Sequence, residues 1–150
     1  MTVKPECRMC QDPLIQEKGL QHPRKVADLE ISTAVLRENL QYYRGYTILV
    51  LRQHAVELWD LDPEIRQKFM EEANQVAHAL AKTFKPLKLN YSLLGNTDPI
   101  NDHLHWHLTP RRLTDPNPKR PIWDGNFPAP DVHLSDEEFR QMADEIRANL

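Results

Sequence analysis

Hydrophobic and polar side chains alternate most strictly between residues 103 and 108 of the chain. Every second position there is a histidine, namely His103, His105 and His107. Bulky apolar side chains lie between them, namely Leu104, Trp106 and Leu108. Successive side chains of a strand point to opposite faces of a sheet, whereas a helix would scatter the three imidazoles around its axis. We therefore predict a strand that ends at Pro110, with three imidazoles on one face and an apolar row on the other.

Other runs of apolar and β-branched residues predict four more strands, over residues 26–31, 33–37, 46–51 and 88–94. The run at 46–51 is nearly continuous in such residues. Gly45 precedes it and permits a turn, because glycine tolerates backbone angles that other residues avoid.

Apolar residues at helical spacing predict a long helix that starts at Pro63 and stops before Pro86. Asp62 is a suitable N-cap for it, and proline fits the first helical position. Ser135 and Glu138 form a capping-box pattern that predicts a C-terminal helix. Strands and helices do not alternate regularly, so the expected fold is α+β, with a mainly antiparallel sheet of about five strands.

Two segments lack a periodic pattern. Residues 1–25 are polar and irregular, and residues 114–130 hold five of the twelve prolines together with Trp123 and Phe127. We expect this Pro-rich segment to be extended and to pack over the sheet through its two aromatic rings. A chain of 150 residues is expected to form one domain, residues 1–150, in which residues 114–150 are an extension ending in the C-terminal helix.

The composition limits the classes of partner that we expect the protein to bind. A net charge of −3 gives no general attraction to nucleic acid polymers or to anionic membranes. The sequence shows no apolar run that would span a bilayer and no signal-peptide pattern, so we expect a cytoplasmic protein. An anionic substrate would need local positive charge. Arg111 and Arg112 are the expected source, whereas Lys119 and Arg120 fit a solvated rim better.

Three aligned imidazoles support two kinds of chemistry. A neutral imidazole nitrogen is a good nucleophile at phosphorus, and its neighbours on the same face can hold its tautomer and donate hydrogen bonds to phosphate oxygens. Alternatively, histidines two residues apart on a strand can share one metal ion.

Cys7 and Cys10 have the Cys-x-x-Cys spacing with which two thiolates grip one zinc ion. No second pair of cysteines exists, so histidines would have to complete the site, and His54 and His103 are the candidates. The alternative is that both residues are ordinary thiols. A thioredoxin-like redox role is disfavoured because the pair lies in a polar segment broken by prolines.

The segments 90–96 and 103–111 resemble the histidine-triad superfamily, whose signature is His-φ-His-φ-His-φ-φ with φ an apolar residue. Leu108 and Thr109 fill the last two positions, so one of them is only partly apolar. Residues 44–54 resemble the family's strand that leads to a histidine and a helix. The resemblance covers about residues 7–125 and implies the histidine-triad fold.

The resemblance also implies roles for individual residues. His105 would be the nucleophile that attacks the α-phosphorus of a nucleotide, and His107 would bind the phosphate or the leaving group. The implied nucleotide-binding positions are Asn39 (with Glu38 as the competing alignment), Asn90, Asn96 and His107, to which we add Arg111 for its charge. Family members with an N-terminal Cys-x-x-Cys, like that of this chain, resemble a zinc-binding branch. The zinc ligands of that branch correspond to Cys7, Cys10, His54 and His103.

The chain departs from the family pattern just before His103, where residues 99–102 stand as if about three residues were inserted. Asp102 is either a carboxylate that orients an imidazole or a turn residue.

The implied activity is hydrolysis or transfer at the α-phosphate of a dinucleoside polyphosphate or a nucleoside phosphoramidate, through a nucleotidyl-histidine intermediate. An adenine nucleotide as substrate and a homodimer are implied as well. Two other classes stay open. One is a nucleotide-binding regulatory module with little turnover, and the other is a metal-stabilised binding protein in which all three histidines are ligands.

Overall fold

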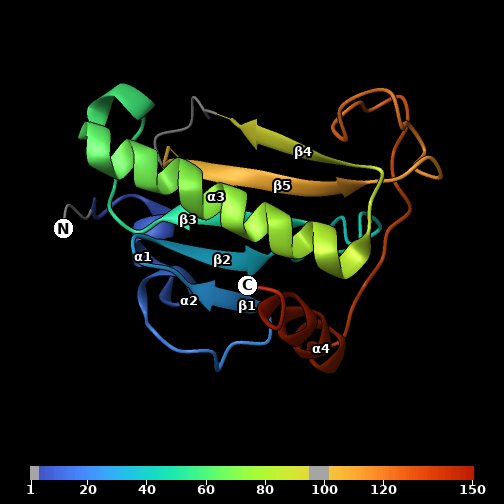
Figure 1. The fold of residues 1–150 in the computed structure, drawn as a ribbon, viewed down its shortest axis with the longest axis horizontal. Helices are drawn as coiled ribbons and strands as arrows, with labels where there is room; N and C mark the ends of the chain where they lie inside the picture. Colours follow the sequence, from blue (N-terminus) through green and yellow to red (C-terminus); the bar gives the residue numbers. More distant parts are fainter. Residues whose placement is uncertain (1–3, 95–101) are drawn as a thin grey trace.

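The computed structural model describes residues 4–94 and 102–150. Within them, five strands form an antiparallel sheet in the order β1-β2-β3-β5-β4, with the two longest helices packed on one face (Figure 1). The strands are β1 (Lys25–Asp28), β2 (Ser32–Leu36), β3 (Thr47–Leu51), β4 (Lys88–Leu93) and β5 (His105–Arg111). The helices are α1 (Arg8–Gln11), α2 (Pro13–Gln16), α3 (Pro63–Phe84) and α4 (Asp136–Arg147), with a 3₁₀ turn at Leu58–Asp60. The α+β fold and its antiparallel sheet agree with the prediction.

The histidine strand differs from its prediction at both ends. β5 starts at His105 and continues through Pro110 to Arg111. The Arg111 carbonyl accepts a hydrogen bond from the Leu87 amide beside β4, so the nitrogen of the preceding proline points away from β4. Pairing with β3 has already ended at Leu108, so the N–H that proline lacks removes no ladder bond.

Helix α3 covers the apolar face of the sheet, as Figure 1 shows. It begins with Pro63 as predicted and ends at Phe84, followed by Lys85 as C-cap with a left-handed backbone (φ 45°). The Asp62 side chain makes no capping hydrogen bond, which differs from its predicted role. The helix and the strands bury one large apolar cluster, which includes Phe69, Val76, Leu80, Leu104, Trp106 and Leu108.

Helix α4 packs beside β1 and α3 and has the predicted capping box between Ser135 and Glu138. It buries Phe139, Met142, Ala143 and Ile146. Near its end, Arg147 donates hydrogen bonds to the Val26 and Lys25 carbonyls of β1 at 2.8 and 2.9 Å. These bonds occupy backbone acceptors at an outer strand of the sheet.

The opposite face of the sheet carries the histidines and a smaller apolar cluster of Tyr43, Tyr46 and Ile122. The Pro-rich segment reaches this face, and its buried residues there include Asp115 and Ile122. Trp123 and Phe127 stay 42% and 46% exposed, but the Trp123 ring lies 5.6 Å from that of His107, so the expected packing over the sheet is found for Trp123. Among the described residues, no helix is both long enough and apolar enough to cross a membrane.

Candidate functional site

Strand β5 places the imidazoles on the face that α3 leaves uncovered. The register pairs Val50 with His105 and Ile48 with His107, so the central strands β3 and β5 fix both rings. All three histidine side chains are almost completely buried, with at most 5% of each residue exposed. Burial disfavours the charged imidazolium and lowers the pKa of each ring, that of His107 to about 3. The rings are therefore neutral near pH 7.

The backbone fixes the tautomer of His105. Its Nδ1 lies 2.7 Å from the His103 carbonyl oxygen, which can only accept a hydrogen bond. The proton of this neutral imidazole therefore lies on Nδ1. Its Nε2 carries an unshared electron pair, which is the form a nucleophile needs.

The tautomer of His107 is the opposite one. Its Nδ1 lies 2.7 Å from the hydroxyl of Tyr46, a residue that is fully buried. The guanidinium of Arg37 lies over the Tyr46 ring, 5.5 Å from its centroid. Among the described residues, His107 Nδ1 is the one hydrogen-bond partner of the Tyr46 hydroxyl, so the buried O–H donates to it. His107 then carries its proton on Nε2, where it is a hydrogen-bond donor.

Arg37 is a site residue that the sequence analysis missed. Its positive charge adds to burial in lowering the pKa of both His105 and His107, so the guanidinium faces the imidazole pair. It directly follows the last residue of β2, and its position at the end of an apolar run gave no signal in the sequence. The predicted ribose ligand Asn39 is exposed, and its Oδ1 accepts a hydrogen bond from Arg37 Nε at 2.8 Å.

Arg111 is engaged inside the protein and does not offer a free charge, which differs from the expectation for an oligophosphate. It is 5% exposed and forms a buried ion pair with Asp115 at 2.7 Å. Its other nitrogens donate to the Asn90 side chain and to the carbonyls of Arg120 and Asn117. Arg111 and Asn90 thus hold the Pro-rich segment against the sheet. The predicted position Asn96 lies outside the described residues.

The structure brings together the four residues expected to bind metal. The possible ligand atoms of Cys7, Cys10, His54 and His103 all lie within 4.8 Å of one another. His103 Nδ1 is 3.3 Å from the Cys7 sulfur and 3.5 Å from that of Cys10. Helix α1 and the residue before it supply both sulfurs, and the His54 Nδ1 completes the group at 3.5 Å from Cys10.

This group fits a metal ion because of the tautomer of His103. Its Nε2 lies 2.6 Å from the Leu51 carbonyl oxygen, so Nε2 carries the proton and Nδ1 points an electron pair at the sulfurs. The two sulfurs form no disulfide. Burial raises the pKa of the Cys10 thiol, so a bound cation would be needed to hold it as a thiolate.

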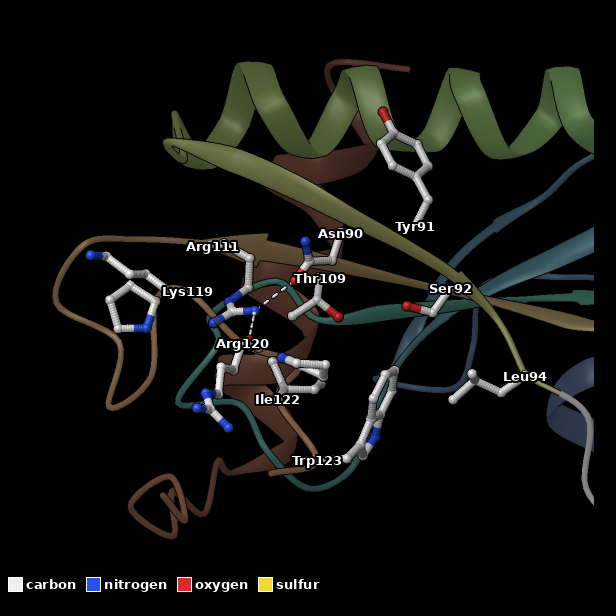
Figure 2. Close-up of a pocket in the computed structure, with 12 residues that line it drawn as sticks. Asn90, Tyr91, Ser92, Leu94, Thr109, Arg111, Lys119, Arg120, Ile122 and Trp123 are labelled. Carbon is white, nitrogen blue, oxygen red and sulfur yellow. Dashed lines mark hydrogen bonds between the residues drawn. The ribbon is translucent and has the colours of Figure 1, made fainter. Parts of the chain in front are cut away.

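A cavity of about 560 Å³ opens on the histidine face of the sheet (Figure 2). Strands β4 and β5 supply Asn90, Ser92 and Thr109 to it, and the Pro-rich segment supplies the facing wall. That wall includes Lys119, Arg120, Ile122 and Trp123. The Trp123 ring lies 5.6 Å from that of His107, centroid to centroid, so the cavity begins beside the imidazole pair.

Comparison with known proteins identifies a family and a shared fold. The model of the HIT domain family matches residues 21–114. A histidine triad protein from Sinorhizobium meliloti is 28% identical with a TM-score of 0.72, and the match covers 84% of this chain and 88% of that one. No curated protein matches the sequence significantly.

Two more distant structures share the fold. A zinc-bound histidine triad family protein from Mycobacterium smegmatis is 19% identical with a TM-score of 0.60, covering 87% of this chain and 84% of that one. A diadenosine triphosphate hydrolase from Plasmodium falciparum is 15% identical with a TM-score of 0.60, covering 89% of this chain and 86% of that one.

Proposed function

Because the chain belongs to the HIT domain family, we propose that it hydrolyses or transfers a nucleotide at its α-phosphate, with His105 as nucleophile. The observation that carries the proposal is the pair of opposite tautomers on one strand face. His105 Nε2 offers an electron pair, and His107 Nε2, two residues along β5, offers a proton for a hydrogen bond. A structural neighbour of this fold is a diadenosine triphosphate hydrolase, which supports an adenine nucleotide as the substrate.

The reaction follows from these two nitrogens in two displacements. In the first, His105 Nε2 forms a bond to the α-phosphorus while the bond from phosphorus to the leaving-group oxygen breaks, and that oxygen keeps the electron pair. His107 Nε2–H and the Arg37 guanidinium lie where they can stabilise the charge that develops on the phosphate oxygens. In the second, water attacks phosphorus, the electron pair returns to His105, and the water loses one proton to solvent.

His105→Asn tests the proposal directly. Wild-type protein should convert a dinucleoside polyphosphate or a phosphoramidate to nucleoside monophosphate, and an alkaline quench should reveal a nucleotidyl adduct on the peptide containing His105. The variant should lose turnover by about a thousandfold or more, and the adduct with it, while still binding nucleotide. His133→Asn is the matched control, because the His133 side chain is 88% exposed. Wild-type protein that binds nucleotide without adduct or product would instead be a regulatory module.

We also propose that zinc occupies the group formed by Cys7, Cys10, His54 and His103. Two thiolates and two imidazoles are a tetrahedral donor set that zinc favours, and the mycobacterial neighbour is zinc-bound. When bound, the ion would tie α1 to the residues that follow β3 and precede β5. His103 would then bind the metal through its ring, while its backbone carbonyl accepts the hydrogen bond from His105 Nδ1. The metal group would thus fix the backbone that orients the nucleophile.

A homodimer is the expected assembly. β4 is an outer strand of the described sheet, and beside it Tyr91 and Met70 are 53% and 52% exposed. An outer strand with exposed apolar side chains favours pairing with a second copy. Light scattering after gel filtration should give twice the chain mass, and Tyr91→Lys with Met70→Lys should shift it to the monomer. A wild-type monomer would contradict this assembly.

A further inference from the structure

The cavity beside His107 extends along β5 away from the proposed catalytic histidines. It follows the histidine face of β5 from Thr109 to Arg111, and His107 is the next residue of that face toward the start of the strand, about 13 Å from Arg111 at the usual rise of a strand. On β4, Ser92 lies opposite His107 and Asn90 lies opposite Thr109 in the register. A group released from phosphorus at His105 and His107 would therefore meet this space.

The charged side chains that line the cavity are positive. Among the described residues, its lining contains Arg111, Lys119 and Arg120 but no carboxylate, although the whole chain has a net charge of −3. Arg111 donates its hydrogen bonds to groups inside the protein, so Lys119 and Arg120 are the cations of the lining that can bind a ligand. Arg120 pairs loosely with Asp124 at 3.5 Å, and its side chain is 66% exposed. The wall is suited to an anion that arrives from solvent or leaves toward it.

The other part of the wall is flat and apolar. Trp123 lines the cavity with its ring 5.6 Å from that of His107 and is 42% exposed, and Ile122 beside it is buried. Figure 2 shows Trp123 near Ser92 and Leu94, with Lys119 and Arg120 toward the Arg111 end. An exposed indole face next to cations favours a ligand that carries both a planar ring and phosphates.

This wall belongs to the part of the chain that the family model does not match. The matched residues 21–114 supply the sheet and the histidines, whereas residues 118–123 lie outside them. Arg111 nevertheless fixes the segment firmly, because it donates to the carbonyls of Arg120 and Asn117 at 2.9 and 2.6 Å. The cavity wall is therefore held in place by contacts inside the protein.

We propose that this cavity binds the leaving group of the reaction and selects one that is a nucleoside phosphate, as in a dinucleoside polyphosphate. The proposal rests on the function proposed above and adds the class of leaving group to it. A small neutral amine, the leaving group of a phosphoramidate, would leave Lys119 and Arg120 without a partner. An amine must also gain a proton to depart, and the low pKa of the buried His107 makes it a poor proton source. A phosphate oxygen departs as an anion and needs only the hydrogen bond.

Two substrates with the same nucleoside separate these possibilities: a dinucleoside triphosphate, and the phosphoramidate of the nucleoside monophosphate with a small uncharged amine. The variant Lys119→Ala/Arg120→Ala should lower kcat/KM for the triphosphate about tenfold and leave that for the phosphoramidate within about twofold. Trp123→Ala should shift the ratio in the same direction. Arg140→Ala is the matched control, because it removes an exposed cation from α4, away from the cavity.

The results distinguish the two proposals. Equal effects on both substrates, or none on the triphosphate, would overturn the leaving-group site while the proposed activity stands. If wild-type protein turns over neither substrate, the proposed activity fails. The affinity of the cavity for a nucleoside diphosphate then tests the binding site by itself. Calorimetry with a nucleoside diphosphate alone should then still show about tenfold weaker binding to Lys119→Ala/Arg120→Ala, and unchanged affinity would reject the site.

Discussion

Tyr46→Phe removes one oxygen atom and tests how the site assigns its protons. The hydroxyl lies 2.7 Å from His107 Nδ1, and both residues are buried, at 0% and 5% exposed. In the variant, neither tautomer of His107 finds a partner for Nδ1 at this position. Leaving a buried polar atom without a partner costs about 1–3 kcal/mol, so the free energy of unfolding should fall by about that amount. Because Nε2–H is no longer enforced, kcat should fall about tenfold or more.

Tyr43→Phe is the control that the fold itself offers. Tyr43 belongs to the same apolar cluster and is equally buried, but its hydroxyl has no hydrogen-bond partner among the described residues. Removing this hydroxyl should leave stability unchanged or raise it, and should leave kcat unchanged. Urea denaturation and steady-state kinetics measure both quantities, and ¹⁵N NMR of the His107 ring reports its tautomer. Equal effects of the two variants on stability and kcat would refute the tautomer argument.

Three further predictions concern the metal group, the buried imidazoles and the turn before β3. A chelator should lower the Tm of wild-type protein and release about one zinc per chain, whereas Cys7→Ser/Cys10→Ser should contain no zinc and not respond; a chelator without effect on the wild type would reject the zinc site. Because the folded-state pKa of His107 is about 3, the unfolded chain binds one more proton there below about pH 6.5. This group should therefore lower the free energy of unfolding with falling pH by up to about 1.4 kcal/mol per pH unit, and His107→Asn should reduce the slope by that amount in urea titrations between pH 4 and 6; parallel slopes would contradict it. Gly45→Ala should cost about 1–3 kcal/mol, because the backbone has φ +87° and a Cβ would collide with the Phe84 ring, while Gly125→Ala, with open space around it, should cost much less.

The sequence predicted the elements well where one local pattern decides them. The capping box at Ser135, the proline at position 63 and the alternation around His105 each depend on neighbours within a few residues. The course of β5 through Pro110 was missed because it depends on where β3 stops pairing, which no local pattern reveals.

The site was predictable to the extent that residue type alone indicates chemistry. Two cysteines and two histidines indicate a metal wherever they meet, and the fold brings them together. Arg37 and Tyr46 were not found, because an arginine and a tyrosine at the ends of strands have many uses. Their role follows from the register of β2, β3 and β5, which sets both beside His107. Arg111 was assigned to substrate for its charge, but Asp115, four residues later, holds it.

Three identical side chains on one strand thus receive different chemistry from three different neighbours. The Leu51 carbonyl takes the Nε2 proton of His103 and turns its Nδ1 toward the sulfurs. The His103 carbonyl takes the Nδ1 proton of His105 and leaves its Nε2 basic, and the Tyr46 hydroxyl does the reverse for His107. Among the described residues, the group able to hold a metal includes neither His105 nor His107. A single metal shared by all three would require His107 to free a nitrogen and so to give up the hydrogen bond that its Nδ1 accepts from the buried Tyr46 hydroxyl, which costs about 1–3 kcal/mol. The arrangement therefore favours one histidine for the metal and two for phosphate chemistry.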